Sequence, residues 1–176
     1  MEESNSQTVA SKDVELCERQ FRKTTRRNSD GRYVVRLPFR DDNFHLRDSK
    51  MMATKRLLSL ERKLNKNIKL KENYEQILRE YLHLGHAQIC RVESNGGYYM
   101  PHHAVIKESS DTTKVRVVFD ASAKSSSGLS LNEALLIGLT IQGKLYEHLI
   151  IFRTYKYVAT ADIEKMYRQI LVHEND

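Results

Sequence analysis

One carboxylate near the C-terminal end of the sequence stands where a divalent cation could bind. Residues 157–162 form a small, apolar stretch typical of a buried strand, and this stretch ends on Asp162. Ile163 follows and would place a backbone carbonyl beside that carboxylate. Mg²⁺ prefers oxygen ligands, usually one or two carboxylates together with substrate phosphates. The pattern therefore predicts a metal site at Asp162, and a capping or salt-bridged aspartate is the alternative.

A second group of residues is suited to phosphate binding. Residues 98–106 and 114–120 have strand-like patterns, and a polar turn at residues 108–113 separates them. Lys107 and Lys114 flank this turn, and Arg116 follows on the second strand. Lysine binds phosphate as a point charge and arginine as a fork of donors. Lys107 and Arg116 could thus clamp a triphosphate, although an exposed hairpin with charged edges needs no function.

Two further clusters contain residues that can bind metals. His83, His86 and Cys90 have a spacing compatible with zinc, but a fourth ligand is not evident. His102 and His103 are adjacent on a predicted strand and point to opposite faces, so they cannot easily share one metal ion. We interpret both clusters as structural.

The charge balance favours an acidic partner. The chain of 176 residues has 29 Lys and Arg against 23 Asp and Glu, a net charge of +6. Such a surplus favours nucleic acid first and an anionic membrane second, with a merely solvated surface as the alternative. Two cysteines without a CxxC pair suggest a reducing compartment, and no apolar run has the length of a membrane span. We expect an intracellular protein of the cytoplasm or nucleus, with no membrane partner.

The elements that must position these residues fall into three parts. Residues 1–30 are a polar, charged extension with a basic cluster and at most one short helix. Residues 31–90 contain a strand that ends at Pro38 and two amphipathic helices with basic outer faces. Asp48 or Ser49 caps the first helix. The second helix covers residues 70–84 and ends at Gly85. Residues 91–176 contain the hairpin, a short helix capped by Ser130, a helix over residues 141–153 and the strand ending on Asp162.

In this order the features resemble a known family, the reverse transcriptases of long-terminal-repeat retrotransposons, and most closely its BEL/Pao group. The resemblance runs from about residue 15 to the end, and it is carried by GRYVVRLPFR, DSKMMATKRLLSLERKL, YLHLGHA, YYMPHHAVIK, TTKVRVVFDASAKSSSGLSLNEAL and YVATADIEKMYRQILVHEND. It implies an α+β fold: the fingers and the start of the palm of a reverse transcriptase, with a basic helical N-terminal extension.

The resemblance also implies roles for individual residues. Asp162 matches the first catalytic aspartate, which holds Mg²⁺ together with the carbonyl of Ile163. Tyr167 matches the aromatic residue beneath the sugar of the incoming nucleotide. The remaining matches lie on the hairpin: Arg116, Lys107 and Lys114 as triphosphate-binding residues, and Asp120 as an acid near the template strand.

The sequence also departs from the family pattern. The family's second and third aspartates lie in a Tyr-x-Asp-Asp hairpin, and no such sequence occurs here. The family normally has proline where this chain has Glu108, Leu139 and Glu174, and an acidic residue where it has Gly143 or Lys144. A lone aspartate provides too little charge and too few ligands for two metal ions, so we expect the chain to be inactive by itself.

Three hypotheses follow. The chain is a fragment of an RNA-directed DNA polymerase, with Mg²⁺ as cofactor and with an RNA/DNA template-primer, deoxynucleoside triphosphates and the missing remainder of the polymerase as partners. Alternatively, it is a non-catalytic nucleic-acid-binding or interaction module in which Asp162 is idle. In the third hypothesis it is a relic of a mobile element with no cellular role.

Overall fold

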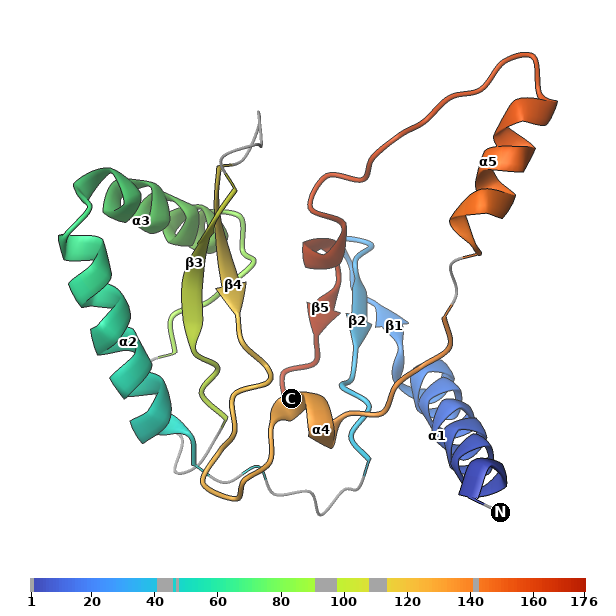
Figure 1. The fold of residues 1–176 in the computed structure, drawn as a ribbon, viewed down its shortest axis with the longest axis horizontal. Helices are drawn as coiled ribbons and strands as arrows, with labels where there is room; N and C mark the ends of the chain where they lie inside the picture. Colours follow the sequence, from blue (N-terminus) through green and yellow to red (C-terminus); the bar gives the residue numbers. More distant parts are fainter. Residues whose placement is uncertain (1, 41–45, 47, 91–97, 108–113, 141–142) are drawn as a thin grey trace. The chain divides into compact units, whose positions relative to one another are not determined.

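The protein has an α+β fold that divides into two compact units. The computed structural model describes residues 2–40, 46, 48–90, 98–107, 114–140 and 143–176, with side chains from residue 12 onward. Unit 1 combines residues 1–40 with residues 135–176, and unit 2 comprises residues 41–134 (Figure 1). The three-part division of the sequence stays a prediction, and its boundaries near residues 30 and 90 do not coincide with those of the units.

Unit 2 packs two helices against a β-hairpin. Helices α2 (Lys50–Asn65) and α3 (Ile68–His83) follow one another, and strands β3 (His102–Ile106) and β4 (Val115–Phe119) form the hairpin. The strands are antiparallel, with Ala104 opposite Val117 and Val105 opposite Arg116. A short helix, α4 (Leu131–Ala134), ends the unit. The predicted helix pair, hairpin and short helix are therefore confirmed.

The core of unit 2 forms where the two helices meet the hairpin. Leu60 and Leu64, one helical turn apart on α2, are buried together with Tyr74 of α3 and Val117 of β4. Side chains four residues apart lie on the same face of a helix, and alternate residues of a strand share one face. The spacing of these apolar residues thus directs both elements toward the same core.

Local contacts and backbone conformation set where the helices of unit 2 begin and end. The Oδ1 atom of Asp48 accepts a hydrogen bond of 2.7 Å from the amide of Lys50 at the start of α2. Ser49 forms no capping bond and instead pairs with the backbone of Tyr99 through its hydroxyl. Gly85 has a φ of +67° just beyond α3, a conformation that glycine adopts readily. Ser49 therefore occupies the N-cap position while the Asp48 side chain binds the first amide of α2, and the expected glycine stop is confirmed.

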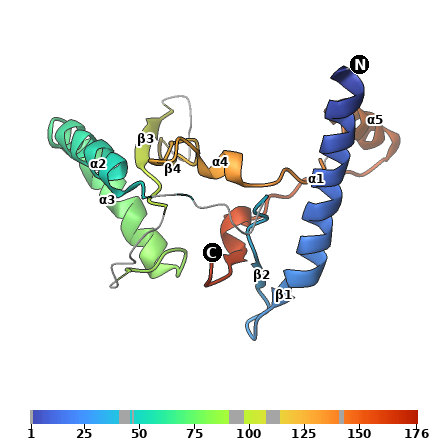
Figure 2. The same ribbon diagram turned by 90° about the horizontal axis from the view of Figure 1, so that it is seen from below.

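Unit 1 contains a small sheet of segments from both ends of the sequence. Its helices are α1 (Glu2–Thr24) and α5 (Leu145–Thr154), with the 3-10 helix η1 (Met166–Gln169). Strands β1 (Arg26–Arg27), β2 (Tyr33–Val35) and β5 (Leu171–Val172) form the sheet in the order β1-β2-β5 (Figure 1). Figure 2 shows β1 and β2 following the end of α1. Strand β2 pairs antiparallel with β1 and parallel with β5. Strand β2 and a helix after residue 141 were expected from the sequence, and both are present.

Helix α1 has 23 residues and is much longer than the one short helix expected within residues 1–30. Its apolar side chains Leu16 and Phe21 are exposed, so an apolar stripe does not hold it. Polar contacts do: Gln20 Nε2 donates to the Leu37 carbonyl over 2.9 Å, and Arg40 pairs with Asp13. These contacts link segments distant in sequence, so periodicity could not reveal them.

The C-terminal segment is fastened to β2 by arginines. Arg36 forms a two-pronged ion pair with Asp176, with 2.6 Å between Nη2 and Oδ1. The amide of Leu37 donates to Oδ2 of the same carboxylate over 2.9 Å. Arg32 donates to the carbonyl oxygens of Arg168 and Gln169. These bonds keep β5 in register beside β2.

The buried strand predicted at residues 157–162 is absent, and this prediction is wrong. The segment belongs to no strand, and the side chains from Tyr157 to Asp162 are exposed. An extended segment becomes a strand only where its backbone groups find partners. The sheet in the described part of unit 1 has strands of two or three residues, and the segment pairs with neither edge of it.

Candidate functional site

The sequence-predicted site residues are divided between the two units. Unit 2 holds Lys107, Lys114, Arg116 and Asp120, whereas unit 1 holds Asp162, Ile163 and Tyr167.

The hairpin of unit 2 has two different faces. Val115 and Val117 are buried toward the helices, so Arg116 and Val118 between and after them face outward and are exposed. Val105, opposite Arg116 in the register, shares this outer face. The hydrogen bond of 2.8 Å from the Lys107 amide to the Lys114 carbonyl extends the pairing beyond the strands.

The three predicted phosphate-binding cations gather on this outer face. Alternation from Arg116 places Lys114 on the same side, and pairing across the hairpin places Lys107 beside Lys114. All three side chains are exposed. Lys114, Lys107 and Arg116 thus form one cationic group at the turn end of the hairpin, which we call the hairpin cation group. Its chemistry suits an anionic ligand that carries several negative oxygens.

Asp120, the predicted template-side acid, lies at the other end of β4 and is engaged within unit 2. Its Oδ2 atom accepts a hydrogen bond of 2.6 Å from Arg56 Nη1, and its Oδ1 accepts one of 3.0 Å from the Ser122 amide. The hydrogen bond from Arg56 is the largest cause that lowers the pKa of this carboxyl. The structure thus gives Asp120 a role in joining α2 to the end of β4.

Asp162 lies on an exposed segment between α5 and η1. The carbonyl of Ile163, the expected second metal ligand, accepts a hydrogen bond of 3.2 Å from the Met166 amide in a turn. Among the described residues no three His, Cys, Asp or Glu side chains gather as a metal-binding group. Asp162 and this carbonyl can contribute oxygen ligands to Mg²⁺, but they supply too few for a complete site.

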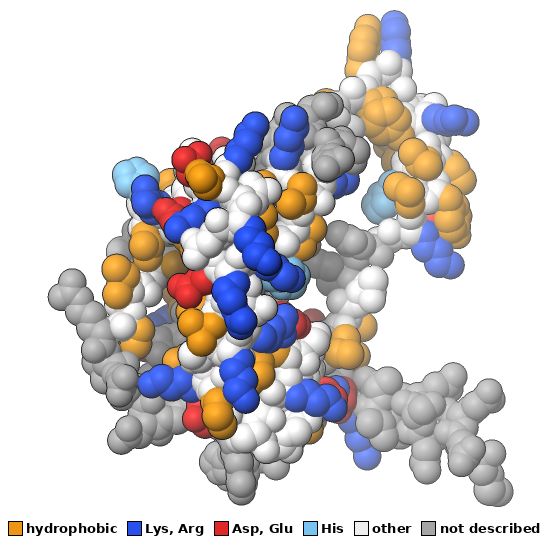
Figure 3. Space-filling model, turned by 60° about the vertical axis from the view of Figure 1, so that its left-hand side comes forward, with side chains coloured by type: hydrophobic (Ala, Val, Ile, Leu, Met, Phe, Trp, Pro, Cys, Tyr) orange, Lys and Arg blue, Asp and Glu red, His pale blue; other side chains and the backbone are white. Residues whose placement is uncertain are grey.

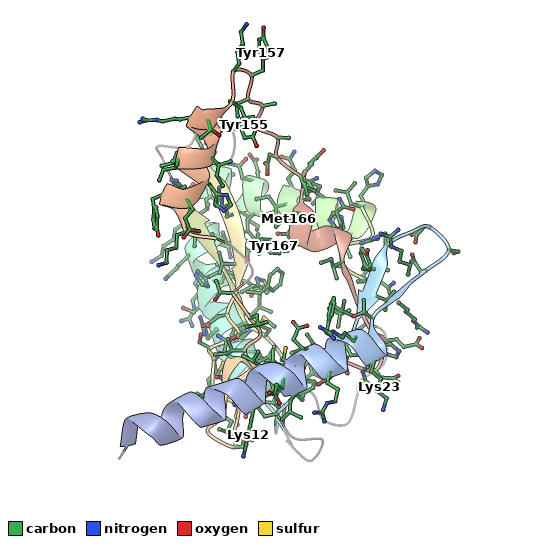
Figure 4. The ribbon with its side chains drawn as sticks, turned by 90° about the vertical axis from the view of Figure 1, so that its right-hand side faces the viewer. Lys12, Lys23, Tyr155, Tyr157, Met166 and Tyr167 are labelled. Carbon is green, nitrogen blue, oxygen red and sulfur yellow. The ribbon has the colours of Figure 1, made fainter. Side chains whose placement is uncertain are left out.

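Tyr167 stands on η1 with its side chain 80% exposed. Figure 4 shows it beside Met166, and it shows Tyr157 projecting outward from the segment after α5. This region also exposes large apolar side chains, among them Ile150, Tyr157 and Ile163. The exposed aromatic ring of Tyr167 is available for stacking on a sugar or base.

The basic faces of α2 and of the start of α3 dominate the charge of the chain more than their helical pattern alone indicates. Residues 50–71 contain eight Lys and Arg and one Glu, a net charge of +7 against +6 for the entire chain. Counting charge in a sliding window would have found this segment. In Figure 3, Lys and Arg side chains gather over α2 and α3.

A groove of about 440 Å³ lies between α2 and β3 within unit 2. Arg56, Lys63 and His103 are among the residues that line it. The buried Nδ1 atom of His103 has no hydrogen-bond partner among the described residues. The groove therefore adds donors and positive charge beside the basic face of α2.

No helix in the described part of the chain is long and apolar enough to cross a membrane. The histidine and cysteine clusters of the sequence, His83 with His86 and Cys90 and the pair His102–His103, form no metal-binding group there either. Comparisons with protein-family models, with curated proteins and with solved structures each found no match for this chain.

Proposed function

We propose that the chain forms the fingers and the start of the palm of a BEL/Pao-type reverse transcriptase. In this proposal it contributes nucleotide and template-primer binding and one Mg²⁺-binding aspartate to RNA-directed DNA synthesis. The observation that carries the proposal is the hairpin cation group: Lys107, Lys114 and Arg116 emerge together on the outer face of one hairpin. The family resemblance assigns triphosphate binding to these same three residues.

The physical basis is charge and geometry. A deoxynucleoside triphosphate carries several anionic oxygens, which a guanidinium fork and two ammonium groups can bind at once. The hairpin holds these cations on a paired backbone, and the core beneath Val115 and Val117 supports that backbone. A ligand would therefore meet a preorganised group rather than three independent side chains.

The test is a titration of the purified chain with a fluorescent deoxynucleoside triphosphate and Mg²⁺. We expect binding that weakens at least about tenfold in the double variant Lys107→Gln with Arg116→Gln, because two charge-assisted contacts are lost. The matched control changes Arg79 and Lys124 to Gln, which removes the same charge from exposed positions of unit 2 outside the hairpin. Equal weakening in both double variants would contradict a specific nucleotide site.

The coding sequence immediately downstream supplies an independent test. An open frame that continues into a Tyr-x-Asp-Asp hairpin would supply the two aspartates that this sequence lacks, together with strands able to pair with residues 157–162. A stop codon directly after Asp176 would remove the polymerase proposal.

A second function has two observations in its favour. Asp162 is exposed outside any strand, and the Ile163 carbonyl already accepts a bond in a turn. Both features suit a non-catalytic nucleic-acid-binding module in which Asp162 is idle. Binding of an RNA–DNA hybrid without any binding of nucleotide would favour this module over the polymerase.

A further inference from the structure

Helix α2 carries a stripe of cations on the side opposite its buried face. Lys55, Arg62 and Lys66 are spaced seven and four residues apart, so they project from nearly the same side of the helix. Leu60 and Leu64 are buried on the other side. All three cations are exposed. We use the name α2 ridge for these three residues together with Lys63 of α2 and Lys69 at the start of α3.

The ridge is not neutralised within the part of the chain that the structure describes. The side chains of Lys55, Lys63, Lys66 and Lys69 have no ion-pair or hydrogen-bond partner among those residues. Arg62 donates only to the carbonyl of Leu58, over 3.2 Å, which leaves its charge uncompensated. Repulsion among neighbouring cations favours the binding of an external polyanion, which relieves it.

We propose that the α2 ridge is a docking surface for the sugar–phosphate backbone of double-stranded nucleic acid. This inference deepens the proposed function and rests on its template-primer partner, but it assigns that partner to a surface separate from the hairpin cation group. The stripe from Lys55 to Lys66 spans roughly 16 Å along the helix axis. A duplex presents about one phosphate charge per 1.7 Å of its axis, so several phosphates lie within this reach.

The composition of the ridge favours a duplex over a single strand. Proteins that bind single strands without sequence preference combine cations with aromatic rings on which the bases stack. Residues 50–71 contain no aromatic residue, so the ridge has no stacking platform. Its cations can contact phosphates but offer little means to read bases. Binding should therefore be independent of sequence and steeply dependent on salt.

The groove beside the ridge extends the same surface. Lys63 belongs to the ridge and also lines the groove, where Arg56 and the buried Nδ1 of His103 lie. A phosphate that enters from the ridge would meet the cationic side chains of Lys63 and Arg56 along the groove. A membrane surface is a less suitable partner, because an interfacial helix presents an apolar face and α2 buries its main apolar face in the core.

Helix α1 offers a control of the same composition and spacing. Lys12, Arg19 and Lys23 repeat the Lys, Arg, Lys order at intervals of seven and four residues, and all three are exposed in unit 1. Figure 4 labels the first and last of them on α1. Their surroundings differ, because residues 12–24 contain four basic and three acidic residues. Replacing either set by Gln removes the same charge. A difference in hybrid affinity between the two triple variants therefore depends on where the charges lie and not on how many are removed.

The experiment titrates the full chain and both triple variants with a fluorescent RNA–DNA hybrid at several salt concentrations. We expect the ridge variant (K55Q, R62Q, K66Q) to lose at least about tenfold in affinity at low salt, with a salt slope smaller by roughly two to three. The control variant (K12Q, R19Q, K23Q) should stay within about twofold of the parent chain. Circular dichroism checks that each variant keeps the helical content of the parent.

Several outcomes would overturn the proposal. Equal losses in the two variants would mean that only net charge matters, and no hybrid binding at low salt would remove the surface altogether. Tighter binding of single-stranded RNA would contradict the duplex assignment. Vesicles containing anionic lipid that bind through the ridge in place of the hybrid would make it a membrane surface.

The same measurements separate this inference from the proposed function. Loss of hybrid binding in the hairpin double variant, with the ridge variant unchanged, would end the ridge proposal and leave nucleotide binding standing. Hybrid binding through the ridge with no nucleotide binding at the hairpin would end the nucleotide-binding proposal and leave the ridge proposal standing.

Discussion

Arg56 of α2 and Asp120 after β4 form an ion pair with 2.6 Å between Nη1 and Oδ2. The pair joins a helix that carries the ridge to the hairpin that carries the cation group. Both side chains are partly exposed, at 40% and 26%. Arg56 also lines the groove beside the ridge. It therefore holds α2 to the end of β4 and also lies at the basic surface of unit 2.

The first prediction concerns this pair. Changing Asp120 to Asn should destabilise unit 2 by at most about 1 kcal/mol, because partly exposed pairs contribute little. Urea denaturation at pH 7 measures the effect, and the double variant with Arg56→Ala isolates the coupling between the two residues. The Arg56 bond lowers the pKa of Asp120 below its usual 3.8, so this stabilisation is present above that pH and is lost as the pH falls below it. A coupling of zero at pH 7 would show that the pair is only incidental.

The second prediction concerns Tyr74 and His102, whose rings stack with centroids 5.9 Å apart. Burial raises the pKa of Tyr74 to about 12, so its hydroxyl keeps its proton, and it shares a hydrogen bond with His102 Nδ1. Burial, and next the neighbouring His103, lower the pKa of His102 below its usual 6.5. The unfolded chain then binds the proton more readily, and stability is lost as the pH falls below 6.5.

Thermal unfolding at pH 8 and pH 5.5 measures this effect. The parent chain should be less stable at pH 5.5, and the variant His102→Asn should show a smaller difference between the two pH values, since Asn can share a hydrogen bond with Tyr74 without titrating. A second variant, Tyr74→Phe, should lose about 1–3 kcal/mol at pH 8, because it leaves a half-buried ring nitrogen unpaired. An unchanged pH dependence in His102→Asn would assign the effect to other groups.

The third prediction concerns the end of α3. Gly85 has a φ of +67°, and an added Cβ would meet nothing within 4 Å. The substitution Gly85→Ala should therefore destabilise unit 2 by roughly 1–2 kcal/mol through backbone strain alone. Gly85→Asn is the matched control and should be destabilised less, because Asn tolerates the left-handed conformation better. Equal unfolding free energies for the two variants would argue against a strained stop.

The fourth prediction concerns Asp162. In the chain by itself, Asp162→Asn should leave both stability and hybrid binding unchanged, because the side chain is exposed and lies outside the ridge. In a polymerase that joins this chain to a Tyr-x-Asp-Asp segment, the same change should abolish DNA synthesis, because one metal ligand is lost. Primer extension measures the second effect, and undiminished extension would remove Asp162 from the catalytic role.

The local patterns of the sequence determined much of unit 2. Alternating residues placed Val115 and Val117 inside and Arg116 outside, and the resulting hairpin brings the predicted phosphate-binding cations together. The helical spacing of Leu60 and Leu64 likewise set the buried face of α2. Such patterns are reliable because each residue's orientation follows from its own backbone conformation.

Contacts between distant segments decided the rest. The sequence showed no reason for a long α1, which depends on the bond from Gln20 to Leu37 and on the pairing of Asp13 with Arg40. The apolar run before Asp162 has the pattern of a strand. It stays unpaired, because no strand in the described part of the chain forms backbone hydrogen bonds with it. Side-chain orientation is a local property, whereas strand pairing and long-range anchoring require partners that only the tertiary structure supplies.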